Sequence, residues 1–256
     1  MKNSLRKDLL EGKILTGTLM TLPSPEVAEI LAKSGFDWLF IDLEHSSINL
    51  QTAQLIVQAA SPQSYCVIRC PSNDEAWINR CLDTSADGII IPQVKTQEEA
   101  DYARHFAKYA PLGGRSVGIS RAHGFGMTFN EYMERANEDT ALIIQCEHIE
   151  AIDNLPAILN VKGIDCVFVG PYDLSTSMNK TGQLKDPEVV DSIERIRKMA
   201  SESNMPLGIF GTAPEFVKAY KQQGFGLLAV NSDTLMLSRS ARDILQNMQD
   251  GSTANT

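Results

Sequence analysis

The sequence has few of the features that mark secreted, membrane or nucleic-acid-binding proteins. Its five cysteines show no CxxC spacing, so we expect reduced core thiols in a cytoplasmic protein rather than a disulfide framework. No apolar run is long enough to span a bilayer, and no apolar segment follows the basic N-terminus as in a signal peptide. The net charge of −9 argues against a nucleic-acid footprint. We therefore expect neither a membrane nor a nucleic acid as partner.

Apolar runs and amphipathic segments alternate along the 256 residues. The strand-like runs cover residues 14–20, 37–42, 65–69, 87–91, 141–146, 165–169, 206–210 and 226–230. The helix-like segments cover residues 25–34, 49–60, 74–85, 96–108, 150–159, 187–203, 213–223 and 234–248. Strands that alternate with helices predict a parallel sheet covered by helices. Eight pairs in this length predict an α/β protein with a closed (β/α)₈ TIM barrel, in one domain spanning 1–256.

One segment interrupts the alternation. Residues 109–140 form a long insertion between the fourth helix and the fifth strand, with a short helix expected at 129–137. Long ordered loops in compact domains are usually functional. The polar C-terminal tail at 250–256 is expected to be frayed.

Polar residues are concentrated where predicted strands end. The strand ends concerned are Asp42-Leu43-Glu44-His45, Arg69, Gln145-Cys146-Glu147 and Gly170-Pro171-Tyr172-Asp173. The carboxyl ends of parallel strands meet at one edge of the sheet, and in α/β barrels that edge carries the active site. The sequence therefore predicts a site built from four different strands.

Two carboxylates of this set suit a metal ion. Glu147 and Asp173 follow predicted strands five and six, which are neighbours about 5 Å apart in a barrel. Hard oxygen ligands without His or Cys favour Mg²⁺, Mn²⁺ or a similar divalent ion. The alternative is that both acids only accept hydrogen bonds from backbone amides at the strand ends. The turn that begins at Gly170-Pro171 favours a ligand, because it lets backbone approach closely.

Two basic side chains suit catalysis at the same edge. His45 follows Asp42 by three residues, and a carboxylate beside an imidazole would raise its basicity as a general acid or base. A surface or capping histidine is the alternative. Arg69 could bind a substrate carboxylate or an enolate oxygen, or it could form a structural salt bridge to Glu44 or Glu147.

These motifs, taken together and in this order, resemble the HpcH/HpaI aldolase family. The segments that carry the resemblance are Gly35-Phe36-Asp37-Trp38-Leu39-Phe40-Ile41-Asp42-Leu43-Glu44-His45, Val67-Ile68-Arg69, Asp87-Gly88-Ile89-Ile90-Ile91-Pro92, Ile144-Gln145-Cys146-Glu147 and Val169-Gly170-Pro171-Tyr172-Asp173-Leu174-Ser175. The resemblance covers the chain from Gly17 to about Ala241. It implies a class II, metal-dependent 2-oxo-acid aldolase of the phosphoenolpyruvate/pyruvate-binding barrel superfamily, which cleaves 4-hydroxy-2-oxo acids to pyruvate and an aldehyde.

The resemblance implies a metal and pyruvate half of the site. Glu147 and Asp173 would hold a divalent ion (Mg²⁺, Mn²⁺ or Co²⁺), and Gln145 would contact the metal's water or the substrate. The residues expected to hold the pyruvate carboxylate are Gly170, Pro171 and Tyr172. A pyruvate enolate would then form on the metal, and no Schiff-base lysine would be needed.

The resemblance also implies roles for the catalytic side chains and for a second subunit. Arg69 would stabilise the enolate, and His45, paired with Asp42, would act as acid or base on the aldol hydroxyl. Asp83, near the end of the third predicted helix, would bind substrate in a neighbouring subunit's site. Homohexamers are common in the family.

Three departures from the family pattern leave the acceptor substrate open. They are Gly113-Gly114-Arg115-Ser116, Ile209-Phe210-Gly211 and Val230-Asn231-Ser232-Asp233. An alternative enzyme would form the same enolate but use another partner, as in a citrate-synthase-like condensation, an acyl-thioester lyase or a decarboxylase. A third interpretation is a non-catalytic ligand-binding barrel, against which the intact set of acids, Arg69 and His45 argues.

Overall fold

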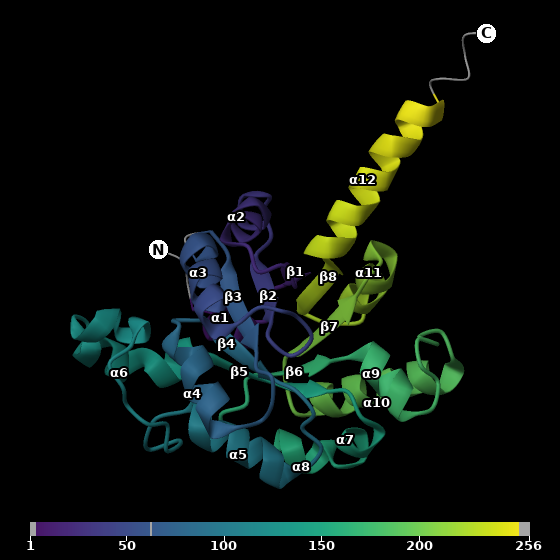
Figure 1. The fold of residues 1–256 in the computed structure, drawn as a ribbon. Helices are drawn as coiled ribbons and strands as arrows, with labels where there is room; N and C mark the ends of the chain where they lie inside the picture. Colours follow the sequence, from purple (N-terminus) through teal and green to yellow (C-terminus); the bar gives the residue numbers. More distant parts are fainter. Residues whose placement is uncertain (1–3, 62, 251–256) are drawn as a thin grey trace.

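Eight parallel strands form a closed barrel in the computed structural model, which describes residues 4–61 and 63–250 (Figure 1). The strands are β1 (Leu15–Met20), β2 (Trp38–Asp42), β3 (Tyr65–Arg69), β4 (Gly88–Ile91), β5 (Ala141–Cys146), β6 (Cys166–Val169), β7 (Leu207–Gly211) and β8 (Leu227–Ser232). They pair in sequence order, and β8 closes the barrel on β1. The predicted (β/α)₈ barrel is confirmed.

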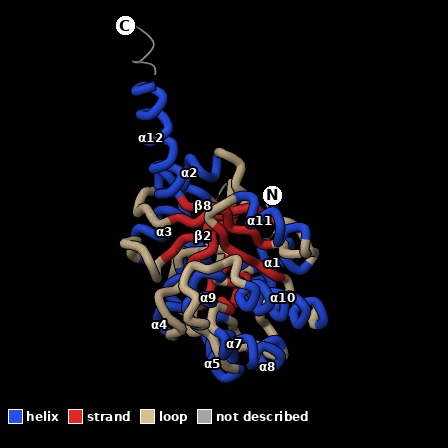
Figure 2. Tube along the Cα trace, turned by 90° about the vertical axis from the view of Figure 1, so that its right-hand side faces the viewer, coloured by secondary structure: helices blue, strands red, loops and turns tan. Residues whose placement is uncertain are grey.

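Helices surround the strands on the outside of the barrel (Figure 2). Those that follow successive strands are α2 (Pro25–Lys33), α3 (Leu50–Ala60), α4 (Glu75–Asp83), α5 (Gln97–Ala107), α7 (Ile149–Asp153), α8 (Leu155–Leu159), α10 (Pro187–Glu202), α11 (Pro214–Gln222) and α12 (Asp233–Asp250). The helix predicted at 150–159 is two short helices, because Pro156 has no N–H with which to continue the hydrogen bonding of α7. The described part of the chain contains no helix that is long and apolar enough to cross a membrane.

Two α-helices of the described residues were not predicted from the sequence. The short helix α1 (Leu5–Leu10) inserts Leu5 and Leu9 into the hydrophobic cluster inside the barrel. The other, α9 (Pro171–Ser177), directly follows β6 and forms part of the cavity described below. Helices this short are stabilised by tertiary packing rather than by their own propensity, so their sequences carry little periodic signal.

The barrel interior is packed with side chains and is not a channel. Trp38, Phe40 and Phe168 form an aromatic cluster, with ring centroids 5.5–6.1 Å apart. A side chain at Gly17 would overlap Trp38, so this strand position needs glycine to admit the indole. The packed aromatic rings therefore fill the barrel interior below the carboxyl ends of the strands.

The insertion lies beside the barrel and contains two short elements. They are the 3₁₀ segment η1 (Arg121–Gly126) and α6 (Phe129–Asp139), which confirms the helix expected at 129–137. The helix α12 continues past the predicted residue 248 to Asp250 and extends away from the barrel in Figure 1. The rest of the tail predicted to be frayed, residues 251–256, lies outside the described residues. All five cysteines are buried, and no disulfide joins them in the described part of the chain, as expected.

Candidate active site

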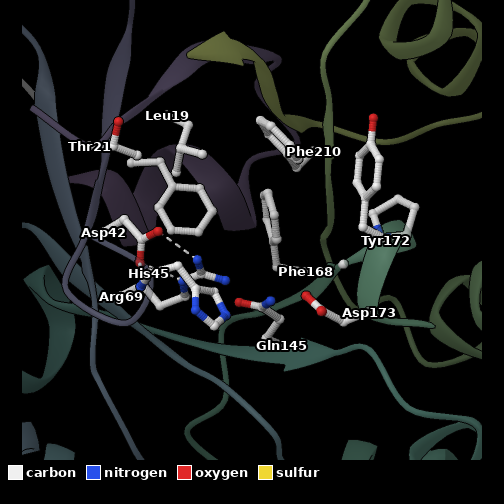
Figure 3. Close-up of a pocket in the computed structure, with 13 residues that line it drawn as sticks. Leu19, Thr21, Asp42, His45, Arg69, Gln145, Phe168, Tyr172, Asp173 and Phe210 are labelled. Carbon is white, nitrogen blue, oxygen red and sulfur yellow. Dashed lines mark hydrogen bonds and ion pairs between the residues drawn. The ribbon is translucent and has the colours of Figure 1, made fainter. Parts of the chain in front are cut away.

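A cavity of about 250 Å³ opens at the carboxyl ends of the strands (Figure 3). The residues that line it are Leu19, Thr21, Phe40, Asp42, His45, Arg69, Gln145, Phe168, Gly170, Pro171, Tyr172, Asp173 and Phe210. They come from β1, β2, β3, β5, β6, β7 and the segments that follow β1, β2 and β6. The predicted site edge is thus the edge at which the cavity lies.

The twofold period of the strands directs the key polar side chains into this cavity. Phe40 points into the barrel, so Asp42, two residues further along β2, faces the same way. The same period carries Arg69 at the end of β3 and Gln145 near the end of β5 inward. The β2–β3 register places Asp42 directly beside Arg69.

Asp42 and Arg69 form a buried, bidentate ion pair. Arg69 Nε donates to Asp42 Oδ1 at 2.9 Å, and Arg69 Nη2 donates to Asp42 Oδ2 at 2.7 Å. Glu44 Oε2 lies 3.2 Å from Arg69 Nη1, which confirms one of the two salt bridges considered for this arginine. The Arg69 guanidinium also lies over the Phe40 ring, 5.2 Å from its centroid. Arg69 is therefore held in one orientation by three neighbours.

The predicted pairing of Asp42 with the His45 imidazole is wrong. Asp42 Oδ1 accepts hydrogen bonds from the backbone N–H groups of Glu44 and His45, while both its oxygens bind Arg69. The His45 side chain is 63% exposed, and its Nε2 lies 3.8 Å from Glu44 Oε2. The reason is that Arg69, on the adjacent strand, occupies the carboxylate of Asp42. The acidic neighbour of the imidazole is therefore Glu44.

Glu147 is a buried carboxylate in an acidic environment. Its side chain accepts hydrogen bonds from the backbone N–H of Gln93 at 2.9 Å and from Gln145 Nε2. Burial raises the pKa of Glu147 to about 7, and repulsion from the carboxylates of Asp173 and Glu44 adds to this, against the opposing effect of the Gln93 N–H. Such a group is easily deprotonated when a cation is close, because the cation removes the reason for the raised pKa.

The residues around Glu147 fit a hard divalent cation. Gln145 Oε1 is buried without a hydrogen-bond partner among the described residues, which leaves one oxygen free beside the two carboxylates. A Cβ at Gly170 would lie 2.9 Å from Glu147 Oε2 and 3.0 Å from Gln145 Nε2, so glycine keeps this space open. Within the described residues no three His, Cys, Asp or Glu side chains are grouped to hold a metal by themselves. Two carboxylates would leave the remaining coordination positions to water and substrate.

The segment after β6 brings the remaining predicted site residues, 170–173, to the cavity. Gly170 and Pro171 line it, and Asp173 points into it from the first turn of α9 (Figure 3). The Tyr172 hydroxyl lies 3.1 Å from Thr212 Oγ1, and its ring lies against Phe210, with centroids 6.3 Å apart. Asp173 and Arg69 therefore line one cavity, and Glu147 lies behind its wall, hydrogen-bonded to Gln145.

Comparison with known proteins agrees with this geometry. The family model "HpcH/HpaI aldolase/citrate lyase" matches residues 16–240. The chain belongs to the HpcH/HpaI aldolase/citrate lyase family. It is 37% identical over 244 residues to a 4-hydroxy-2-oxo-heptane-1,7-dioate aldolase of Escherichia coli, covering 94% of this chain and 93% of the relative.

Two further relatives extend the comparison. The chain is 36% identical over 252 residues to a hydroxypyruvate/pyruvate aldolase of Roseobacter denitrificans, covering 97% of this chain and 98% of that protein. The crystal structure of an HpcH/HpaI family protein from Burkholderia cenocepacia matches with a TM-score of 0.92 at 30% identity, covering 97% of this chain and all of that one. Both the family and the aldolase class predicted from the sequence are thus confirmed.

One predicted site residue, Asp83, does not line the cavity of this chain. Asp83 ends α4, where its Oδ1 accepts a hydrogen bond from Arg115 Nη2 at 2.8 Å. It lines a hollow between α3, α4 and the insertion instead of the cavity of this chain. Its role in a neighbouring subunit stays a prediction.

Several residues of the cavity were not singled out from the sequence. Leu19, Phe40 and Phe168 form part of its walls, and Thr21 lies at its rim. The strand period alone could have identified Leu19, Phe40 and Phe168 as inward-facing. Gln93, whose backbone holds Glu147, has a positive φ of 57°, and no sequence signal marks it.

Proposed function

We propose that the protein is a divalent-metal-dependent aldolase that cleaves 4-hydroxy-2-oxo acids to pyruvate and an aldehyde. The observation that carries the proposal is one cavity lined by Asp173, Gln145 and a rigidly held Arg69. The buried Glu147 carboxylate lies directly behind Gln145, from which it accepts a hydrogen bond. A buried carboxylate of raised pKa, such as Glu147, beside the space that Gly170 leaves open is typical of a catalytic site rather than of a non-catalytic barrel. The aldolase names of the relatives support the same reaction.

Glu147 and Asp173 would hold the metal ion, for which Mg²⁺, Mn²⁺ and Co²⁺ are the candidates. When bound, such an ion supplies Lewis-acid polarisation of the 2-oxo group. Gln145 Oε1, which is buried and has no hydrogen-bond partner in the described part of the chain, would accept a hydrogen bond from water or substrate at this position. Gly170, Pro171 and the backbone of Tyr172 would contact the carboxylate of the oxo acid. These roles are the ones that the family resemblance implied for the same residues.

Arg69 would stabilise negative charge on the oxygen of the pyruvate enolate. Its guanidinium is oriented before the reaction by Asp42 and Glu44, so little reorganisation is needed as charge develops. Asp42 would therefore act as a positioning residue for Arg69 rather than as a partner of His45. This assigns the buried ion pair a function, although such a pair by itself is weak evidence for stability.

His45 would accept the proton of the substrate's 4-hydroxyl group. As that proton moves to the imidazole, the C3–C4 bond breaks, its electron pair forms the C2–C3 double bond of the enolate, and the aldehyde is released. Protonation of C3 then gives pyruvate. The exposed His45 can return its proton to water, and Glu44, 3.8 Å away, would stabilise the imidazolium.

The direct test is pyruvate release from a panel of 4-hydroxy-2-oxo acids, measured with each metal and with a chelator. We expect release that needs the metal and is abolished in Asp173→Asn, whereas the exposed control Glu150→Gln keeps full activity. Release that survives both the chelator and Asp173→Asn would refute the metal assignment. No release from any acid would refute the aldolase.

The assembly and location of the enzyme belong to the same proposal. We expect a homohexamer in which Asp83 of one chain reaches a neighbouring subunit's site, and a cytoplasmic location. Mass photometry of the purified protein tests the assembly. Fractionation of the producing cells tests the location.

A further inference from the structure

The wall of the cavity that lies away from Gln145 and Asp173 is mainly apolar. In Figure 3, Leu19 and Phe210 lie across the cavity from these two residues, and Tyr172 lies beside Phe210. Leu19 and Phe210 are partly buried and pack on the hydrophobic cluster inside the barrel. If pyruvate is held at Gln145 and Asp173, this wall faces the other product, the aldehyde.

The polar atoms of this wall are already engaged. Thr21 Oγ1 donates to Asp233 Oδ1 at 2.9 Å, and the backbone N–H groups of Thr21 and Leu22 donate to Asp233 Oδ2 at 2.9 and 2.8 Å. The Tyr172 hydroxyl is paired with Thr212 at 3.1 Å. The wall therefore offers an aldehyde mainly apolar surface, and the hydrogen bond between the Tyr172 and Thr212 hydroxyls uses one of their two O–H donors.

The charges around the cavity disfavour a second carboxylate on the substrate. Of the described residues that line it, Arg69 is the only lysine or arginine, and it is bound to Asp42 and Glu44. Behind Thr21 lies Asp233, whose negative charge would repel an anionic tail. A carboxylate buried against this wall would lack a cation, which is unfavourable in a partly desolvated site.

We propose that Leu19, Phe210 and Tyr172 form an acceptor subsite that selects uncharged, apolar aldehydes over aldehydes with a distal carboxylate. This inference rests on the proposed aldolase function and specifies its substrate class. It separates this chain from the relative named for heptanedioate, a substrate with a carboxylate at each end. Phe210 is the specificity-determining residue, because its ring lies between Leu19 and Tyr172 in this wall (Figure 3).

The subsite predicts a graded response to tail length. Each methylene buried against apolar surface contributes about 0.8 kcal/mol, which corresponds to about a fourfold gain in kcat/KM. The gain ends when the tail fills the cavity of about 250 Å³, which pyruvate and the aldehyde share. The series from 4-hydroxy-2-oxopentanoate to the longer 4-hydroxy-2-oxo acids measures this directly.

The decisive experiment compares two seven-carbon substrates that differ at one end. They are 4-hydroxy-2-oxoheptanoate, which releases an apolar aldehyde, and 4-hydroxy-2-oxoheptanedioate, which releases one with a carboxylate. We expect kcat/KM at least 100-fold higher for the first acid in the full-length, metal-loaded enzyme. Phe210→Arg, which adds a cation to the wall, should shift this ratio at least tenfold towards the diacid, and Phe210→Met, of similar volume and apolar, should keep it.

The outcomes separate the subsite from the aldolase assignment. Equal kcat/KM for the two acids, or a preference for the diacid, overturns the subsite while the aldolase stands. An unchanged ratio in soluble, active Phe210→Arg overturns the role of Phe210. Pyruvate release from neither acid, nor from any shorter acid, overturns the proposed function and the subsite with it.

Discussion

Removal of the negative charge of Glu147 should stabilise the metal-free protein at alkaline pH. Burial raises the pKa of Glu147 to about 7 in the folded chain, against an ordinary value of 4.5. Between these two values the folded state holds a proton that the unfolded state has lost, so stability falls as the pH rises through this window. The wild type therefore loses about 3 kcal/mol of stability as the pH rises from 4.5 to 7.

Glu147→Gln should therefore be more stable than the wild type at pH 8 and no more stable at pH 5. The substituted amide can still accept the hydrogen bond of the Gln93 N–H, but its NH₂ group meets Gln145 Nε2, which costs about 1 kcal/mol. The net gain at pH 8 is then about 2 kcal/mol, or roughly 4–8 °C in the unfolding temperature of a chain of this size.

Thermal and urea unfolding of the chelator-treated protein between pH 5 and pH 8 measures this effect. The matched control is Glu150→Gln on α7, whose carboxylate is exposed and whose loss should change stability by less than about 0.5 kcal/mol at any pH. A saturating divalent ion should reverse the order, because only the wild type gains about 2.7 kcal/mol at a hundredfold excess over Kd. If the stability of Glu147→Gln depends on pH as that of the wild type does, the raised pKa assigned to Glu147 is refuted.

Three further predictions concern the site. Arg69→Lys should lower kcat/KM by about 10²–10³-fold, because lysine cannot keep both hydrogen bonds to Asp42 while facing the substrate. In steady-state kinetics, a loss below tenfold would contradict the role of Arg69 at the enolate oxygen. His45→Ala should slow aldol cleavage by about 10²-fold or more but slow the exchange of pyruvate methyl protons, followed by NMR, much less; equal losses would argue against a separate proton-transfer role. Gly170→Ala should weaken metal binding about tenfold in calorimetry, since its Cβ would meet Glu147 Oε2, and wild-type affinity would show that this space is not used.

Much of the fold followed from local pattern. Each strand begins within about one residue of its predicted start, because an apolar run bounded by turn residues is a signal that tertiary packing does not override. The inward direction of Asp42, Arg69 and Gln145 follows from the same twofold period. The convergence of these residues at one cavity then required only that the strands be parallel and closed.

The contacts within the site were less predictable. His45 follows Asp42 closely in sequence, yet the carboxylate binds Arg69 from the neighbouring strand, because register across strands decides which side chains meet. Asp83 is tied to Arg115 of the insertion, a contact between segments whose relative position no local pattern encodes. Which group a carboxylate such as Asp42 or Asp83 binds depends on which of several possible hydrogen-bond donors lies closest after folding.

The sequence by itself determined the number and order of strands, because strand period and turn chemistry are local properties. It also determined the edge of the barrel at which the cavity lies and the residue types present there. Only the tertiary structure decided that Asp42 holds Arg69, that Gln93 and Gln145 hold Glu147, and that Leu19, Phe210 and Tyr172 share one apolar wall. Apart from the Gln145–Glu147 hydrogen bond, these are contacts between residues far apart in the chain. Their energies depend on distance and burial, which exist only once the barrel has closed.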